Sequence, residues 1–284
     1  MLPVAELVLV QGVQHNPLLW RTMRDPMPDD LARSGANFAS FRDALAAARP
    51  DVLVVLGSDH ARKFTFENSP AFCIGKADHY VCTYENEVRT FGLEGWEVPG
   101  DRDLAGHLLG GSELAGGFDF AMSNEWLLDH SFSIPLVYMT DLDIPIVPIH
   151  ANAAIPPLPP ASRFAALGSY LAESIASEPS DRRVALIASG HLATEVGGPR
   201  HFLGGESPDA EFDAMAVEWM GSGDLDGAIA GCTLERVLAA GNVSAQYLNF
   251  IAALAAAGSR PADFAEGTQS RFAAAPFFMW EVGE

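Results

Sequence analysis

Short runs of β-branched and apolar residues alternate along the chain with longer stretches in which apolar positions recur every three or four residues. The first pattern predicts buried strands and the second predicts amphipathic helices. The predicted strands are Leu7–Gln11, Val52–Leu56, Ala71–Ile74, Phe118–Met122, Ile144–Ile149 and Val184–Ala188. The predicted helices are Asp30–Ala48, Ser162–Ser177, Pro208–Met220 and Val243–Ala257. This alternation favours an α/β fold in which a central mixed sheet is flanked by helices.

Capping residues and turn-forming residues mark the expected ends of these elements. Ser162 and Asn242 are the expected N-caps of two helices, and Gly258 is expected to end the last one. The proline-rich run Ile155–Pro160 predicts an extended crossover. No boundary divides the chain, so residues 1–284 are predicted to form a single domain. Residues 260–284 show weak periodicity and are expected to be a tail packed on that domain, with Phe272–Trp280 as a candidate subunit contact.

The charge of the chain excludes some classes of partner. Seventeen Lys and Arg residues stand against 37 Asp and Glu residues, which gives a formal net charge of −20. Such an excess repels nucleic-acid phosphates and anionic lipid surfaces, so neither nucleic acid nor membrane is an expected partner. No apolar run approaches the length of a membrane span, and the N-terminus lacks the features of a signal peptide, so a cytoplasmic protein is predicted. The three cysteines form no CxxC pair and are expected to be buried.

Four predicted strands are each followed by a histidine, at His15, His60, His150 and His191. Functional groups of open α/β sheets collect just beyond the carboxyl ends of the strands. His15 and His60 are therefore candidates to converge on one metal ion, as the histidines of a facial triad do. The alternative for each is a hydrogen-bonded structural histidine. Asp59, beside His60, is either a carboxylate that orients the imidazole or a turn residue.

A fifth histidine, His130, lies in the sequence Asp-His-Ser just before an apolar stretch. Asp129 or Ser131 is a candidate N-cap of a helix there. A histidine at such a place can also act as an acid or base near neutral pH.

The segment SGHLATEVGGPR, from Ser189 to Arg200, follows a predicted strand and is rich in small and polar residues. It lacks the spacing of a phosphate-binding loop, and the chain has no GxSxG nucleophile elbow. The candidates for chemistry in this segment are His191, Thr194, Glu195 and Arg200, with a structural turn as the alternative.

The stretches GVQHNPLL, VVLGSDHARKFTFENSPAFCIG, LDHSFSIPL, SGHLATEVGGPR and AAGNVSAQYLNFIAALAA occur in a recognisable order and approximate spacing. In this respect the chain resembles the class III extradiol ring-cleaving dioxygenases, from about residue 4 to residue 258. The resemblance implies a non-haem Fe(II) enzyme that binds a catechol and O2 and cleaves the ring beside the diol. It places His15 and His60 at the two histidine ligands of the iron.

The resemblance also exposes a departure at the third ligand. The family has a glutamate where this chain has Gln246. A glutamine can bind a metal through its neutral carbonyl oxygen, but it adds no negative charge, so Fe(II) would be held less tightly. An inactivating exchange of glutamate for glutamine is the alternative.

The remaining family positions concern proton transfer and substrate binding. His130 matches a histidine proposed to donate a proton. A second family histidine aligns with Thr194, and this chain instead has His191 three residues earlier, as a candidate base. Glu195 and Arg200 are candidates for substrate contact, and Arg62 and Lys63 are further possible anchors for a substrate carboxylate.

The sequence thus predicts an Fe(II)-dependent extradiol dioxygenase acting on a catechol-type or aminophenol-type ring. One alternative is a non-catalytic or metal-poor member of the same family, favoured by Gln246. Another is a metal-dependent hydrolase in which Zn(II) activates water. The resemblance further implies a homodimer or pairing with a small second subunit.

Overall fold

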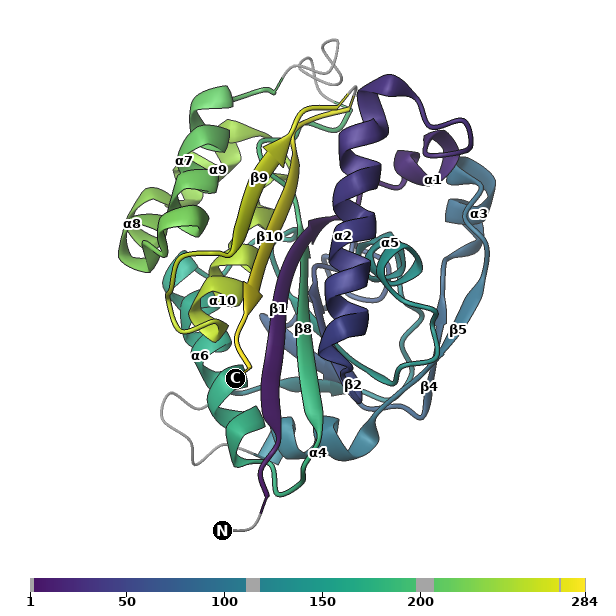
Figure 1. Cartoon of the computed structure of the whole chain (residues 1–284), viewed down its shortest axis with the longest axis vertical. Coiled ribbons are helices and arrows are strands. Elements are labelled where there is room, and N and C mark those ends of the chain that lie inside the picture. Colours follow the sequence, from purple (N-terminus) through teal and green to yellow (C-terminus); the bar gives the residue numbers. More distant parts are fainter. Residues whose placement is uncertain (1–2, 111–117, 198–206, 271, 284) are drawn as a thin grey trace.

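The computed structural model describes residues 3–110, 118–197, 207–270 and 272–283. Its centre is an eight-stranded sheet in the order β6-β3-β7-β2-β8-β1-β10-β9 (Figure 1). The strands are β1 (Glu6–Gln14), β2 (Val52–Gly57), β3 (Phe72–Gly75), β6 (Ala121–Ser123), β7 (Ile146–Ala151), β8 (Arg183–Gly190), β9 (Phe264–Thr268) and β10 (Ala275–Glu281). The neighbours β7, β2, β8 and β1 are parallel, whereas β3 and β10 join them in antiparallel fashion. The predicted mixed sheet is therefore confirmed.

The central strands are apolar throughout because both faces of the sheet are covered. In β2, Val52, Val54 and Leu56 belong to one hydrophobic cluster, and Leu53 and Val55 belong to the other. Strand β8 divides its side chains in the same way. Since successive side chains of a strand point to opposite faces, an uninterrupted apolar run serves two cores at once.

Helices cover both faces of the sheet. The helical elements are α1 (Leu18–Thr22), η1 (Asp29–Leu31), α2 (Ala32–Ala48), α3 (Glu85–Phe91), α4 (Arg102–Gly110), α5 (His130–Met139), α6 (Ala161–Ser177), α7 (Ala210–Ser222), α8 (Leu225–Gly231), α9 (Leu234–Ala240), η2 (Ser244–Tyr247) and α10 (Leu248–Ala256). Helices α2 and α5 pack on one face, and α4, α6 and α10 pack on the other (Figure 1). A separate antiparallel pair, β4 (His79–Cys82) with β5 (Trp96–Pro99), flanks α3.

The C-terminal residues correct one prediction. They do not lie on the domain as a tail, because β10 pairs with β1 and β9 pairs with β10 inside the central sheet. Phe277, Phe278 and Trp280 are fully buried within this chain, so the prediction that Phe272–Trp280 forms a subunit contact is wrong for these side chains. Their aromatic rings fill the two cores between the sheet and its helices.

Two helix starts also differ from the prediction. Helix α6 begins at Ala161 after Pro160, and Ser162 is already inside it. The helix expected over Val243–Ala257 is divided into the 3₁₀ turn η2 and α10, and Asn242 does not cap it. The Asn242 side chain is bound to Val196 instead, donating to its carbonyl and accepting from its amide.

Several smaller expectations are met. The run Ile155–Pro160 has no regular structure, and the three cysteines are buried. Among the described residues, no single helix is long and apolar enough to cross a membrane. One bent pair, Leu234–Ala240 with Ser244–Ala256, passes by length and composition only.

Candidate metal centre

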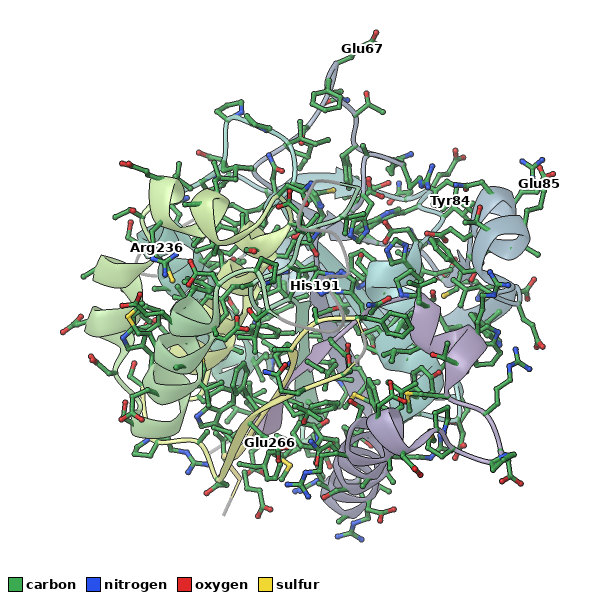
Figure 2. The ribbon with its side chains drawn as sticks, turned by 90° about the horizontal axis from the view of Figure 1, so that it is seen from above. Glu67, Tyr84, Glu85, His191, Arg236 and Glu266 are labelled. Atoms are coloured by element: carbon green, nitrogen blue, oxygen red, sulfur yellow. The ribbon has the colours of Figure 1, made fainter. Side chains whose placement is uncertain are left out.

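The site lies at the carboxyl edge of the parallel strands, where the polar ends of β1, β2 and β8 meet. Gln14 in β1 is in register with Gly190 in β8, so the next residues, His15 and His191, are neighbours. Their ring centroids are 4.1 Å apart. In the view onto this edge, His191 lies near the middle of the molecule (Figure 2).

His60 reaches the same place from the end of β2 and is held by a carboxylate from another element. The Oδ2 atom of Asp129 accepts hydrogen bonds from the His60 amide and from His60 Nδ1, both at 2.8 Å. Burial alone would raise the pKa of Asp129, but the nearby His60 and His130 rings and the Ser131 hydrogen bond hold it well below its usual range. A carboxylate only accepts hydrogen bonds, so it fixes the proton on Nδ1 and leaves the lone pair of the His60 ring on Nε2.

Asp59 is a turn residue, which is one of the two roles expected for it. Its carboxylate accepts hydrogen bonds from the amides of Arg62, Lys63 and Phe64, as a turn residue does. The carboxylate that orients His60 is thus Asp129, which also caps α5 through the Ser131 amide.

His15 and Gln246 complete the group around His60. His15 Nδ1 is 2.7 Å from Ser189 Oγ, and its buried Nε2 has no partner among the residues described. Gln246 Nε2 is 3.0 Å from His60 Nε2, while Gln246 Oε1 is buried and likewise unpartnered within the described part of the chain. Unpaired polar atoms are costly to bury, so this cluster of free donor atoms indicates a missing ligand.

The donor set fits a divalent metal ion. Imidazole nitrogens of His15, His60 and His191 all lie within 4.8 Å of one another. Burial lowers the pKa of His15 far below its ordinary value and that of His191 to about 3, and the neighbouring histidines lower both further. Neutral imidazoles at neutral pH are what metal ligation requires. The structure brings two candidates for a third donor next to His15 and His60, namely Gln246 and His191.

His130 lies beside His60 at the start of α5, with the ring centroids 4.2 Å apart and the planes nearly parallel. Its Nδ1 is hydrogen-bonded to Oε1 of Glu87, which also accepts from the His130 amide. Glu87 is fully buried, and its Oε2 accepts from the Tyr84 amide at the start of α3. Because Nδ1 is engaged, the Nε2 atom of His130 is the one available for proton transfer.

The loop after β8 holds three further predicted residues. Thr194 donates its amide to Ser244 Oγ at 2.8 Å, and its buried hydroxyl has no partner in the described residues. Glu195 accepts from the Asn242 amide and does not line the cavity beside the histidines, so its contact with substrate stays a prediction. Arg200 lies outside the described residues.

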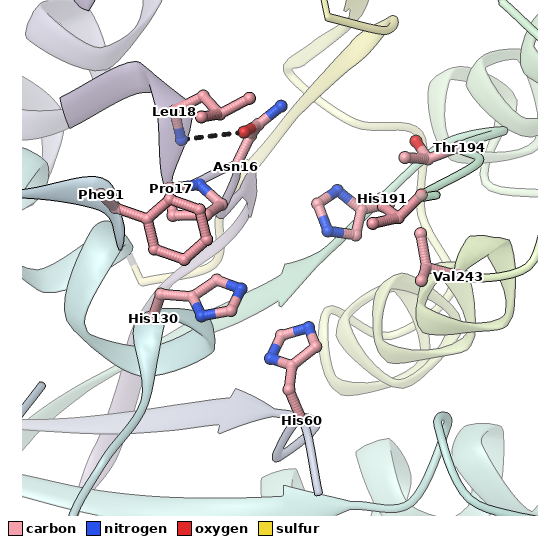
Figure 3. Close-up of a pocket in the computed structure, with 10 residues that line it drawn as sticks. Asn16, Pro17, Leu18, His60, Phe91, His130, His191, Thr194 and Val243 are labelled. Carbon is pink, nitrogen blue, oxygen red and sulfur yellow. Dashed lines mark hydrogen bonds between the residues drawn. The ribbon is translucent and has the colours of Figure 1, made fainter. Parts of the chain in front are cut away.

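A cavity of about 360 Å³ opens onto the histidines. His60, His130 and His191 border it, and Figure 3 shows Leu18 and Phe91 across the cavity from Thr194 and Val243. Among the described residues, the lining is Asn16, Pro17, Leu18, His60, Phe91, His130, His191, Thr194, Val196 and Val243. Its size lies in the range of small-molecule sites, which are about 300–1,000 Å³.

His150 is the strand-end histidine that does not join this group. It lies inside β7, where its Nδ1 accepts from the Asp59 amide and its ring packs on Phe64. Burial lowers its pKa to about 3. Three contacts that orient the histidines could not be found from the sequence, namely those of Glu87 with His130, of Ser189 with His15 and of Asp129 with His60. The Asp-His-Ser pattern drew attention to Asp129 only as a candidate N-cap.

Comparison with known proteins identifies the family. Residues 10–283 match the family model described as the catalytic LigB subunit of aromatic ring-opening dioxygenase. This chain belongs to that family. The predicted resemblance is thereby confirmed over nearly the whole length.

Curated relatives in this family carry the name 2,3-dihydroxyphenylpropionate/2,3-dihydroxicinnamic acid 1,2-dioxygenase. The Rhodococcus jostii RHA1 relative is 32% identical over 183 residues, which is 64% of this chain and 54% of the relative. The Paraburkholderia xenovorans LB400 relative is 32% identical over 190 residues, or 66% and 56%. The Escherichia coli K12 relative is 28% identical over 183 residues, or 64% and 54%. The chain thus spans about half the length of these relatives.

A solved structure shows that the fold occurs elsewhere. The uncharacterized protein JW3007 of Escherichia coli K12 superposes with a TM-score of 0.56 at 19% identity, covering 96% of this chain and 99% of its own.

Proposed function

We propose that this protein is an extradiol dioxygenase that opens a catechol-type or aminophenol-type ring with O2 at a non-haem Fe(II) site. The observation that carries the proposal is the convergence of three side chains beside a cavity bordered by His130 and His191. The buried His15 Nε2 and Gln246 Oε1 have no partner among the described residues, and His60 Nε2 lies 3.0 Å from the Gln246 amide nitrogen. Family membership supports ring opening as the class of reaction.

In this proposal His15 and His60 hold the metal through Nε2, and Gln246 supplies its carbonyl oxygen as the third donor. A half-turn of the Gln246 amide would bring that oxygen to where its nitrogen now faces His60. Bound Fe(II) would hold the diol and O2 side by side and let electrons pass from the ring to O2.

The protein residues supply proton transfer and positioning. His191, which borders the cavity next to His15, is the proposed acceptor of a proton from the diol as it binds. His130, aligned by Glu87, is placed to return a proton from Nε2 during ring opening. The buried hydroxyl of Thr194 can hydrogen-bond to a polar group of the bound ring.

The test is anaerobic reconstitution with Fe(II), followed by measurement of O2 uptake and of a yellow ring-opened product over a panel of catechols and aminophenols. His60→Ala should abolish both signals, while His79→Ala, at an exposed position, should leave them unchanged. Absence of O2 uptake by the iron-loaded protein across the panel would contradict the proposal.

Gln246 and the histidine cluster also favour two other candidates. A metal-poor, non-catalytic member of the family would lose iron to a weak chelator and turn over no substrate. A hydrolase would retain Zn(II) on three imidazoles, a donor set typical of catalytic zinc. Elemental analysis of protein purified without added metal separates these cases. A cytoplasmic location and a homodimer or second subunit stay predictions.

A further inference from the structure

We propose that the cavity beside the histidines selects catechols with an uncharged, apolar ring substituent and disfavours those with a carboxylate. This inference rests on the proposed function, and it adds the substrate class to it.

Away from the histidines, most of the described side chains that line the cavity are hydrocarbon. Leu18 from the start of α1 and Phe91 from the end of α3 form one side, and Val243 forms the opposite side (Figure 3). Val196, which is 51% exposed, also lines the cavity. A ring bound by its diol at the histidines would direct a substituent between these side chains.

The polar groups of the wall do not offer a counterion. Asn16 is uncharged, and because its Oδ1 accepts from the Leu18 amide, only its side-chain NH2 group could donate a hydrogen bond to a carboxylate. The Thr194 hydroxyl is uncharged. Of the described residues that line the cavity, none is Lys, Arg, Asp or Glu.

The predicted cationic anchors lie elsewhere. The Arg62 guanidinium is placed over the Tyr84 ring, 5.8 Å from its centroid, and does not line the cavity. Lys63 borders a different hollow together with Phe64 and Cys73. A carboxylate buried without a cation or several hydrogen bonds is strongly disfavoured, whereas burial of an alkyl group is favourable.

The field of the whole protein acts in the same direction. With a formal net charge of −20, the molecule repels an anionic substrate at a distance and leaves a neutral one unaffected. The names of the curated relatives specify a propionate and a cinnamic acid as substrates, so the substrate class proposed here differs from theirs.

The test compares 3-propylcatechol with 3-(2,3-dihydroxyphenyl)propanoate, which differ only in a terminal methyl or carboxylate group. Binding to the Fe(II)-loaded protein is measured anaerobically by calorimetry, and kcat/KM is then measured with O2. The propyl compound should bind at least about tenfold more tightly, the scale of discrimination expected of an apolar pocket.

Leu18→Arg would place a cation in the wall and should reduce or reverse this preference. Val243→Lys is a second variant for the opposite wall. Leu238→Arg adds the same charge to an exposed position of α9 that does not line the cavity, and it should keep the wild-type preference.

Equal or tighter binding of the propanoate by the wild type would overturn the inference, and so would failure of both compounds to bind. If the propanoate is preferred and Arg200→Ala removes that preference, Arg200 is the carboxylate anchor. Tighter binding of the propyl compound without ring opening would support the apolar pocket and contradict the proposed dioxygenase activity. The two failures are therefore distinguishable.

Discussion

Residue 246 decides whether the candidate metal centre contains an anionic ligand, because the other candidate donors are imidazoles. Gln246 stands where the family resemblance places a glutamate, with its amide 3.0 Å from His60 Nε2. The histidines also differ in the hydrogen-bond partner of Nδ1, which is a carboxylate for His60 and His130 and a serine hydroxyl for His15. Single substitutions can therefore separate metal affinity from proton transfer.

Gln246→Glu should raise the affinity for Fe(II) by at least about tenfold, since it adds a negative charge that attracts the cation. Metal affinity is measured by competition with a chelator under anaerobic conditions. Gln246→Ala should lower it, and His191→Ala should impair turnover more than metal content. A larger loss of metal in His191→Ala than in Gln246→Ala would instead identify His191 as the third ligand.

Glu87→Gln should lower kcat by about 10- to 100-fold, the size of effect typical of residues that orient a working imidazole. Metal content should not change, because Glu87 contacts His130 and not the proposed ligands. The matched control is Glu85→Gln in the same helix, where the side chain is 86% exposed. Loss of metal in Glu87→Gln would contradict the assigned role.

Asp213 predicts a dependence of stability on pH. Its Oδ1 accepts from the Ala193 amide and so ties α7 to the loop that carries Thr194. Burial raises the pKa of Asp213 to about 6. The folded protein therefore keeps a proton that the unfolded chain has already released, and its stability falls as pH rises through this interval.

Asp213→Asn should accordingly raise the free energy of unfolding by about 1–3 kcal/mol at pH 8 and change it little near pH 4. Urea unfolding at the two pH values measures this difference. The exposed Asp43→Asn removes the same charge from α2 and should show no such contrast. Equal effects of Asp213→Asn at both pH values would show that burial does not disfavour the charged form.

At the scale of elements, helix α6 crosses α10 at very short range. A Cβ atom on Gly168 would lie 1.9 Å from the carbonyl oxygen of Ala252, so only glycine permits this crossing. Helix α10 follows directly on η2, which carries Gln246. The distance between these helices thus supports the position of the third proposed ligand.

Gly168→Ala should destabilise the protein by about 1–3 kcal/mol, as overpacking of a tight core does. Gly110→Ala at the end of α4, where a Cβ would meet nothing within 4 Å, is the matched control and should be neutral or stabilising. Thermal and urea unfolding of both variants provide the measurement. If the two variants were equally stable, the two helices would be free to separate.

The sequence was informative where a pattern is local. The apolar runs at Val52–Leu56 and Val184–Ala188 predicted buried strands, because short continuous apolar runs are typical of strands covered on both faces. The histidines that follow them could be assigned to one edge because parallel strands share their carboxyl ends. The pairing of β10 with β1 could not be predicted, since the periodicity of residues 260–284 is weak and their partner lies at the other end of the chain.

The site could be predicted only in part for the same reason. His15, His60, His130 and His191 were found by their positions after strands or before a helix. Asp129 is 69 residues from His60, and Glu87 is 43 residues from His130, so no spacing rule connects them. A contact of this kind is decided by tertiary packing.

At the scale of the whole molecule, the surplus of acidic side chains does not extend into the described lining of the cavity. The formal net charge of −20 lies on acidic side chains such as Glu67 and Glu85, labelled at the periphery of Figure 2. The described wall of the cavity carries no acidic or basic side chain apart from its histidines. The net charge of the protein therefore affects how readily charged molecules approach it, and the side chains that line the cavity affect which molecules bind there.

Metal binding should stabilise the entire fold, because the proposed donors come from the residues that follow β1 and β2 and from η2. A metal that binds only the folded state at 100 times its dissociation constant adds about 2.7 kcal/mol of stability. Fe(II) should therefore raise Tm in the wild type under anaerobic conditions, and the double variant His15→Ala/His60→Ala should not respond. No rise in the wild type at saturating Fe(II) would contradict a metal site at these residues.

The wide separation of these donors along the chain has a further consequence. His60 and Gln246 are 186 residues apart, yet their side chains meet. A metal ion between them would act as a reversible cross-link that closes one very long loop, and the entropy of the unfolded chain changes slowly with the length of such a loop. The ion would thus bind tightly only after the first and last thirds of the chain have come together. Iron content would then be a measure of the fraction of protein that has folded completely.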